Sequence, residues 1–531
     1  MSRTFITGWH ISRGFTQINA DLIRVYQRKS AVNILILFGT LLTVGACTRP
    51  EVNGRSGGGE VVKVSPSQNL QTAIDRARPG DVIELEAGKV YEGPIKLPAK
   101  DGDAFITIQT SAVAELPEGK RVGPAQRNLF AKLQTSTAGE SVIKTTSGSH
   151  HYRFVGIEVS TAKSDQKAYE LITIGDARQT EADVPHDIVI DRSWIHGWDT
   201  QDVQRGVSLN GKDITVSNSY INEIHGRGYD TQALCGWNGP GPFKILNNYL
   251  EAAGENILFG GADPSISGLI PTKIEIRGNF LFKPLRWNMK DPSYGGIHWS
   301  IKNLLEIKMG RDVTIDGNWL ENCWGDAQIG YAVLFTVRNQ DGKAPWATIE
   351  NVTFTNNVVK NSEQGFQLLG KDSPNISQPA NGVKITNNLF IGISNRFLTM
   401  TEYPNVTLSH NTHFQGGNIM SLYGEPSPGF VYTDNITNRA PNGYGIFGDS
   451  AGEGNPALAR YAPGVSIKRN VIIGANASVY PPNNAFPATA EEVGFQDYAG
   501  GKFGLTAKSK FKGTATDKTD PGCQVDRLPS H

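Results

Sequence analysis

The sequence contains little cysteine and no excess of either charge. Four cysteines occur among 531 residues, at positions 47, 235, 323 and 523, and none belongs to a CxxC pair. This spacing excludes the common zinc motifs, and the odd number left after Cys47 gives no disulfide framework. We therefore expect buried or half-buried thiols with at most one bridge. Lysine plus arginine equals aspartate plus glutamate at 51 each, a balance that lacks the basic surface typical of nucleic-acid binding.

A long hydrophobic run occurs near the N-terminus. Arg28 and Lys29 precede residues 31–46 (AVNILILFGTLLTVGA), a run too short to span a membrane comfortably and of the length of a signal-peptide core. It ends in Val44-Gly45-Ala46-Cys47, which resembles the lipobox of bacterial lipoproteins. The resemblance implies that residues 1–46 are a signal peptide, that Cys47 carries a lipid anchor, and that the chain is exported to the outer membrane or cell surface. An ordinary signal peptide or a single anchor helix are the alternatives.

Glycine, asparagine, valine and isoleucine dominate the chain after a polar, glycine-rich tether at residues 47–60. Short apolar runs flanked by turn residues predict strands rather than helices. The pattern V-x-I-x-x-N-x-L, clear at residues 313–320, recurs along the chain with spacings from 23 to 39 residues. Its central residue is Ile157, Ser193 and Ser219 in the first three copies and asparagine in the next eight, at 248, 279, 318, 357, 388, 411, 435 and 470.

The recurring asparagine predicts a stack of coils. Equivalent residues of stacked strands lie about 4.8 Å apart, close enough for buried asparagine amides to hydrogen-bond along a ladder. An antiparallel sandwich or propeller would predict neither this column nor the variable period. A short helix at residues 69–77 followed by GDVIELEAGKVYEGPIKL resembles the N-terminal cap of right-handed parallel β-helices of the pectate-lyase type.

We therefore expect an all-β chain: a single-stranded, right-handed parallel β-helix of the pectin-lyase-like kind, with eleven or more coils and a helical cap. It would occupy residues 61–515, followed by a tail at 516–531. The segment at 494–522 is expected to cover the last coil.

Carboxylates follow several of the asparagine positions. Aligning the copies brings Asp230, Glu255, Asp326 and Glu363 to roughly one column, which predicts a groove midway along the solenoid. We expect Asp230, Glu255 and Asp326 to bind Ca²⁺, because stacked like charges need a cation, a basic neighbour or raised pKa values. Sugar hydroxyls or a proton are other partners for these groups. Solvated turn acids are the alternative interpretation.

Basic and aromatic side chains lie in the same loops. Aromatic faces stack on sugar rings, so a groove with several tryptophans suits a glycan, although each tryptophan alone could equally pack beneath a loop. The residues expected to bind substrate are Arg205, His225, Arg227, Trp237, His298, Trp299 and Trp324.

Two chemistries suit a long groove. In β-elimination the carboxylate of a uronic acid is neutralised by Ca²⁺ or arginine, and a basic side chain removes the C5 proton. LLEIKMG at 304–310 followed by VRN at 337–339 resembles the chondroitinase B and alginate lyase group, in which a lysine on one coil acts with an arginine on the next. The resemblance implies that Lys308 is the base and Arg338 its partner, with Glu306 nearby. Strand alternation also allows Glu306 and Lys308 to share a solvent face.

The other chemistry is hydrolysis by paired carboxylates. The Asn-Thr-Asp, Asp-Asp, Gly-His-Gly and Arg-Ile-Lys signatures of polygalacturonases are absent, which argues against that family of hydrolases. A non-catalytic glycan-binding or adhesin-like protein is a further alternative, since segments such as GENILFGGADP (254–264) are similar to bacterial surface β-helix proteins. The sequence favours a lyase that acts on an acidic polysaccharide, and fold alone does not decide between these functions.

Overall fold

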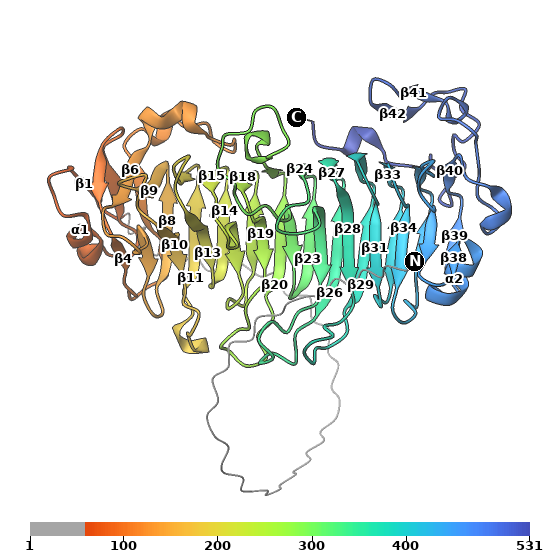
Figure 1. Cartoon of the computed structure of the whole chain (residues 1–531). Coiled ribbons are helices and arrows are strands. Elements are labelled where there is room, and N and C mark those ends of the chain that lie inside the picture. The colour runs from red at the N-terminus through yellow and green to blue at the C-terminus, as the bar shows by residue number, and fades with distance from the viewer. Residues whose placement is uncertain (1–58, 531) are drawn as a thin grey trace, which may run out of the picture. The chain divides into compact units, whose positions relative to one another are not determined.

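The computed structural model describes residues 59–530, which form a solenoid of three parallel sheets (Figure 1). In each sheet a strand pairs with the equivalent strand of the coils before and after it, in parallel register. The expected parallel β-helix is therefore confirmed. The expected signal peptide, Cys47 and most of the tether lie outside the described residues.

Sheet A contains fourteen strands. They are β1 (Val61–Val64), β2 (Val82–Leu85), β5 (Ile106–Thr110), β8 (His150–Val155), β11 (His186–Asp191), β14 (Lys212–Ser217), β17 (Phe243–Leu246), β20 (Thr272–Arg277), β23 (Gly310–Asp316), β26 (Ile349–Thr355), β29 (Asn381–Thr386), β32 (Val406–Ser409), β35 (Val431–Thr433) and β39 (Ser466–Lys468).

Sheet B contains thirteen strands. They are β3 (Val90–Glu92), β6 (Ala131–Thr135), β9 (Ile157–Thr161), β12 (Trp194–His196), β15 (Tyr220–Ile224), β18 (Tyr249–Ala252), β21 (Phe280–Phe282), β24 (Trp319–Cys323), β27 (Val358–Ser362), β30 (Leu389–Ile393), β33 (Thr412–Gln415), β36 (Ile436–Asn438) and β40 (Val471–Ile473).

Sheet C also contains thirteen strands, the last of them antiparallel. They are β4 (Ile95–Leu97), β7 (Ile143–Thr145), β10 (Ala168–Ile174), β13 (Val203–Leu209), β16 (Gln232–Gly236), β19 (Glu255–Phe259), β22 (Leu305–Ile307), β25 (Tyr331–Thr336), β28 (Gln364–Leu369), β31 (Leu398–Thr401), β34 (Met420–Tyr423), β37 (Ile446–Gly448) and β38 (Gly452–Glu453).

Helices are few and short. The α-helices are α1 (Leu70–Arg76) and α2 (Asn455–Tyr461), and the 3₁₀ turns are Val113–Glu115, Pro124–Leu129, Glu181–Asp183, Leu285–Trp287, Ala477–Val479, Glu491–Val493 and Val525–Arg527. None of the helices among residues 59–530 combines the length and the apolar character that crossing a bilayer requires.

The repeat places its apolar residues in a continuous core. In the coil at residues 304–342, Val313 and Ile315 of β23 and Leu320 of β24 are fully buried, while Thr314 between them is only partly covered. This alternation is the period of two that sends successive side chains to opposite faces of a strand. The same positions of the other coils stack on these three residues to form one core cluster along the solenoid.

The asparagine ladder lies at the bend between sheets A and B, as predicted. Asn318 Oδ1 accepts hydrogen bonds from the backbone N and the Nδ2 of Asn279, at 2.9 and 3.0 Å. Asn318 Nδ2 in turn donates to Asn357 Oδ1 at 2.9 Å and to the carbonyl of Ile276 at 2.9 Å. The pattern repeats through the predicted asparagines and ends at one further residue, Asn484.

Serine hydroxyls continue the ladder toward the N-terminus. The backbone N of Ser219 donates to Asn248 Oδ1 at 2.9 Å, and the backbone N of Ser193 donates to the hydroxyl of Ser219 at 3.1 Å. Ser193 accepts from the backbone N of Ile157 at 3.3 Å. In the copies with serine, the backbone N–H groups at the bend therefore still have acceptors, because a hydroxyl can accept one hydrogen bond while it donates another.

The N-terminal end is closed as expected. Asn69 caps helix α1 by accepting a hydrogen bond from the backbone N of Thr72 at 2.9 Å, and such a cap satisfies one of the free donors of a helix start. Leu70 and Ile74 of this helix are buried against the core. The predicted helix at residues 69–77 therefore covers the open end of the first coils.

The C-terminal end corrects one expectation. The last coil is covered by α2 and by the segment after β40, where Leu458, Tyr461 and Tyr480 join the core. The segment at 494–522 instead turns back along the flank of sheet B (Figure 1). Its hairpin of β41 (Phe495–Asp497) and β42 (Lys502–Leu505) packs with outward-facing apolar residues of sheet B, and the backbone N of Cys523 donates to Thr412 Oγ1 at 3.0 Å. The outward apolar side chains of β27, β30 and β36 need this cover, and α2 already closes the end.

The three described cysteines, Cys235, Cys323 and Cys523, are buried and unbridged. Burial raises the pKa of each thiol, so all three behave as small apolar side chains.

Candidate functional site

Lys308 and Arg338 lie side by side on neighbouring coils of sheet C. Lys308 follows β22 directly and Arg338 follows β25, and the backbone N of Arg338 donates to the carbonyl of Lys308 at 3.0 Å. The structure thus brings Lys308 and Arg338 together on successive coils. Both side chains line a cavity of about 330 Å³, together with Glu306, Gln328, Tyr331, Thr336 and Gln367.

A carboxylate holds each cation of the pair. Lys308 Nζ lies 3.8 Å from Glu306 Oε1, and Arg338 Nη1 donates to Asp372 Oδ1 at 3.0 Å. Asp372 is itself fixed, because its Oδ2 accepts from the backbone N of Asn339 at 3.0 Å. The Arg338 side chain is 33% exposed, so part of the guanidinium faces the cavity while Asp372 orients it.

Glu306 is a buried carboxyl whose pKa is raised well above its usual value. It stands in the outward row of sheet C between Leu258 and Leu334, its register partners on the coils before and after. Burial raises the pKa of Glu306 to about 7, Lys308 opposes that rise, and Glu255 adds to it. Asn303 Nδ2 donates to Glu306 Oε2 at 3.2 Å and to Gln328 Oε1 at 2.9 Å. A carboxyl of this pKa can exchange a proton near neutral pH.

Tyr331 is a cavity residue that the sequence pattern did not single out. It begins β25, is 5% exposed, and shares a hydrogen bond of 2.6 Å with Thr399 Oγ1. Burial raises the pKa of its phenol, so the group is a hydroxyl at neutral pH.

A column of polar side chains runs along the leading edge of sheet C. Register pairs Gln232 with Glu255 and Tyr331 with Gln364, and the pairing of Ile257 with Leu305 and of Leu305 with Val333 places Asn303 between Glu255 and Tyr331. We call Gln232, Glu255, Asn303, Tyr331 and Gln364 the polar column. Four of its buried oxygens have no hydrogen-bond partner within the described chain: Gln232 Oε1, Glu255 Oε1, Asn303 Oδ1 and Gln364 Oε1.

The expected column of Asp230, Glu255, Asp326 and Glu363 is wrong in register. Glu255 pairs with Gln232 rather than Asp230, and Gln364 rather than Glu363 stands beside Tyr331. The loops before the strands differ in length, so counting residues from each asparagine does not align them. Glu363 instead accepts a hydrogen bond from the backbone N of Gly325 at 2.7 Å.

The residues expected to bind Ca²⁺ do not fit one ion. Lys302 Nζ lies 2.5 Å from Asp230 Oδ2 and 3.5 Å from Glu255 Oε1, so its ammonium already supplies their counter-charge. Asp326 accepts from the backbone N of Ile301 at 3.1 Å and pairs with His298 Nε2 at 2.8 Å. Within the described chain, the one group of three or more histidine, cysteine or acidic side chains close enough to share an ion lies elsewhere.

Two of the residues expected to bind substrate are buried where the loop at residues 284–302 packs on the solenoid. His225 is 0% exposed and Trp299 is 2% exposed, and their rings stack with centroids 3.8 Å apart. Trp287 packs against the edge of His225. These rings therefore pack the base of the loop, and their burial leaves no face open to a sugar. Arg227 lies at the surface above Trp299 and pairs with Asp202 at 2.5 Å.

The other expected binding residues lie at two places. Arg205 of β13 donates to Glu170 Oε1 at 3.1 Å and lies 5.0 Å from the centre of the Trp237 ring, a cation–π contact on the outer face of sheet C. Trp324 lies with His298 and Asp326 around a small cavity beside the loop at 284–302. The structure thus does not gather the expected aromatic residues into one cleft.

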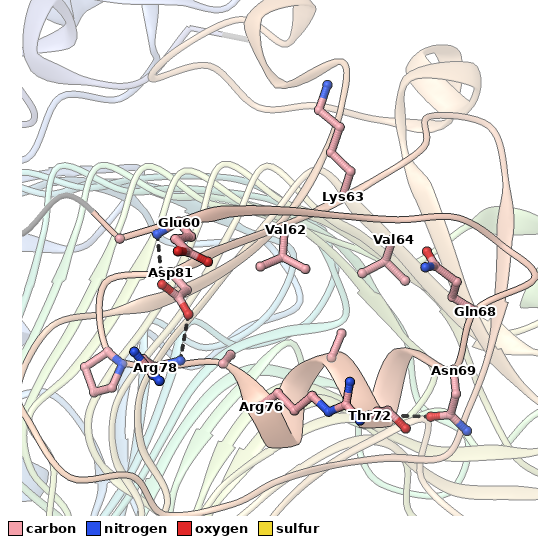
Figure 2. A pocket seen from close by; sticks show the side chains of 14 residues that line it. Glu60, Val62, Lys63, Val64, Gln68, Asn69, Thr72, Arg76, Arg78 and Asp81 are labelled. Carbon is pink, nitrogen blue, oxygen red and sulfur yellow. Dashed lines mark hydrogen bonds between the residues drawn. The ribbon is translucent and has the colours of Figure 1, made fainter.

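A larger cavity lies at the N-terminal cap. It measures about 810 Å³ and separates β1 from α1, as Figure 2 shows. Asp81 accepts there from the backbone N of Glu60 at 2.9 Å and of Arg78 at 2.7 Å, and Asn69 caps the helix (Figure 2). Because these polar groups already satisfy backbone donors, the cavity suits a structural cap, and we place no chemistry in it.

No protein-family model matches the sequence, and no curated protein matches it. Several solved structures are similar to the chain at low identity. The catalytic unit of a GH87 alpha-1,3-glucanase from Streptomyces thermodiastaticus covers 82% of this chain and 68% of its own, with 12% identity and a TM-score of 0.43. The PL6 family alginate lyase AlyGC covers 88% of this chain and 57% of its own, with 13% identity and a TM-score of 0.41.

PfbA, a surface adhesin of Streptococcus pneumoniae, covers 80% of this chain and 91% of its own, with 10% identity and a TM-score of 0.43. Pectate and alginate lyases and phage tailspikes also appear among the similar structures. The parallel β-helix fold itself follows from the register of the chain's own three sheets.

Proposed function

We propose that the protein is a polysaccharide lyase that cleaves an acidic glycan by β-elimination in the cavity around Lys308 and Arg338. The observation that carries this proposal is the placement of Lys308 and Arg338 on neighbouring coils, where both line one cavity. Adjacent coils hold the two groups at the spacing of neighbouring strands, about 4.8 Å. A uronic acid in the cavity would therefore contact both groups at once.

The roles follow from the geometry. Arg338, oriented by Asp372, binds the carboxylate of the uronic acid and stabilises the negative charge that develops when the C5 proton leaves. Lys308 Nζ, in its neutral amine form, takes that proton and becomes an ammonium. The electron pair of the C5–H bond forms a double bond between C4 and C5, the C4–O bond to the next sugar breaks, and the departing oxygen takes up a proton from water. No step is routed through Ca²⁺, because the acidic residues expected to hold it are paired with Lys302 and His298.

The proposal is tested by incubating the protein with alginate, pectate and chondroitin and following the absorbance of the unsaturated product. A lyase releases product from at least one polymer, and Lys308→Ala lowers the rate about 100-fold or more, the contribution expected of a general base. Lys371→Ala is the matched control, because Lys371 is 57% exposed and pairs with Glu402 outside the cavity. Retention on a polymer without any product would instead identify a non-catalytic glycan-binding protein.

Hydrolysis is a second candidate, favoured by the pKa of about 7 at Glu306. A carboxyl that is protonated near neutral pH can act as the general acid of a glycosidase. New reducing ends without an unsaturated product, abolished in Glu306→Gln, would identify this reaction and overturn the lyase proposal.

Export and lipid anchoring form a separate part of the proposal. The Val44–Cys47 sequence supports attachment of the mature chain to the outer membrane through a lipid on Cys47, which would present the solenoid to polymers at the cell surface. Labelling with a radioactive fatty acid should mark the wild-type protein and not Cys47→Ser.

A further inference from the structure

Three histidines and an aspartate meet at the start of β8 and β11 in sheet A, away from sheet C. Strand register pairs His150 with His186 on the next coil, and their rings stack with centroids 4.8 Å apart. His151 and Asp187 follow them, both in left-handed backbone conformation with φ of 55° and 52°. This shared conformation turns the two side chains to the same place on successive coils.

The potential ligand atoms of His151, His186 and Asp187 all lie within 4.8 Å of one another. His151 Nε2 is 3.9 Å from Asp187 Oδ2, and His186 Nδ1 is 2.8 Å from the same oxygen. Two ligands that each bind one ion at about 2.1 Å are themselves roughly 3 to 4 Å apart. The first distance already fits, and the second widens slightly when an ion replaces the proton that His186 and Asp187 share.

We propose that His151, His186 and Asp187 bind a divalent transition-metal ion of the Zn²⁺ class, with at least one coordination position open to water. Two imidazoles and one carboxylate are the ligands such ions prefer, whereas Ca²⁺ and Mg²⁺ require oxygen ligands. Three protein ligands leave the fourth position of a tetrahedral ion free. The site is independent of the function proposed for the cavity in sheet C.

His150 positions the ligands without binding the ion. Its Nδ1 lies 2.8 Å from His151 Nδ1, so one of these nitrogens carries a hydrogen that the other accepts. With the hydrogen on His151 Nδ1, the lone pair of His151 is on Nε2, the atom that faces Asp187. A hydrogen bond to the second nitrogen of a metal-binding histidine is the usual way in which proteins fix its tautomer.

The neighbouring side chains pack around His151 and Asp187 without taking up their potential ligand atoms. Phe105 packs against the edge of His151 with centroids 5.2 Å apart, and Arg153 stacks on Phe105 rather than on Asp187. Lys212, which follows His186 in the register, is 58% exposed and its Nζ lies 4.0 Å from Asp213. The side chains of His186 and Asp187 are 37% and 34% exposed, so an ion can reach them from solvent.

The test uses the full chain without a polyhistidine tag, freed of metal by dialysis against a chelator. Calorimetric titration with Zn²⁺ should show one ion bound per chain, and Co²⁺ should give visible absorption bands. Asp187→Asn and His151→Asn should weaken Zn²⁺ binding about 100-fold or more, since a lost ligand costs at least as much as a lost outer partner. Asparagine is chosen because it tolerates the left-handed conformation of both positions.

His410→Asn is the matched control. His410 also faces two carboxylates, Asp434 and Asp517, but no second histidine among the described residues, and the variant should bind Zn²⁺ as the wild type does. Circular dichroism spectra of the variants that match the wild type would show that the fold is retained. Absence of saturable Zn²⁺ binding in the wild type, or unchanged affinity in Asp187→Asn and His151→Asn, would overturn the proposal.

Discussion

The asparagine ladder and the polar column are both stacks of buried polar side chains, and they differ in how fully their atoms are bonded. In the ladder, each amide of the central coils donates to the next amide and to a backbone carbonyl. In the polar column, four buried oxygens from Gln232 to Gln364 accept no hydrogen bond from the described chain. The ladder therefore pairs its own amides along the whole stack, and the polar column does not.

The difference in hydrogen bonding distinguishes a structural stack from a stack that lies near a candidate site. A buried polar group without a partner costs about 1–3 kcal/mol, so a fold retains one only where other interactions outweigh that cost. Of the polar column, Tyr331 lines the cavity with Lys308 and Arg338, and Asn303 Nδ2 donates to Glu306 at 3.2 Å.

The largest effect on stability is expected from Asn318→Ala in the ladder. The change removes the acceptor of two Asn279 donors and the donor to Ile276 and Asn357, which should lower the free energy of unfolding by about 3 kcal/mol or more. Urea denaturation measures this. The exposed Asn381, which bonds only to Asn405 among the described side chains, provides the control, and an equal loss in Asn381→Ala would remove the contrast between ladder and surface.

Arg338→Ala should affect activity where Asn318→Ala affects stability. Loss of the guanidinium removes the charge that stabilises the developing anion, and we expect kcat/KM on the polymer to fall about 100-fold. Arg338→Lys should recover only part of the loss, because an ammonium cannot make the paired hydrogen bonds of a guanidinium. Arg311→Ala, on sheet A and paired with Glu350, should keep full activity. Equal activity of the Arg338 variants and wild type would exclude Arg338 from the site.

Glu306→Gln should change the pH dependence of stability. The pKa of Glu306 is about 7 in the folded protein and near 4.5 in the unfolded chain, so the folded state binds the proton more tightly. The contribution of this difference in proton binding to the free energy of unfolding is fully present below pH 4.5. It is lost as the pH rises to 7, by up to about 3 kcal/mol.

Glutamine imitates the protonated carboxyl at every pH. The variant should therefore match the wild type near pH 4 and unfold at higher urea concentration above pH 7. The same substitution removes the carboxylate that faces Lys308, which makes the increase in the free energy of unfolding above pH 7 smaller. A difference between the two proteins that is constant from pH 4 to pH 8 would contradict the raised pKa.

The smallest effect is expected from Gln364→Met in the polar column. Gln364 Oε1 has no partner in the described chain to lose, and its Nε2 donates only to the carbonyl of Ile329, at 3.1 Å. The free energy of unfolding measured by urea denaturation should change by less than about 1 kcal/mol. A loss as large as that of Asn318→Ala would show that the two stacks do not differ.

The sequence predicted the ladder and missed the polar column for one physical reason. The asparagines recur because each bend between sheets A and B needs the same hydrogen bonds, so Asn248 through Asn470 stand in a fixed pattern. Members of the polar column share only a position, and loops of different lengths precede them, which is why Glu255 was aligned with Asp230 instead of Gln232. Lys308 and Arg338 lie on neighbouring coils because both closely follow strands whose apolar patterns fix the register.

Burial could not be read from residue type. His225 and Trp299 have the chemistry of a sugar site, but the loop at 284–302 folds over them and uses their rings as its core. The histidines at 150, 151 and 186 gave no motif in the sequence, because the coil spacing alone brings them together.

The path of the C-terminal segment affects how the solenoid unfolds. In a simple stack each coil contacts only its neighbours, so the chain could unravel one coil at a time from its end. Here Thr516 bonds to Asp434, Cys523 to Thr412 and Gln524 to Asn387, so that one strap joins three successive coils. Those coils can separate only after the strap has left sheet B, and the C-terminal third should therefore resist mechanical pulling and proteolysis as one unit.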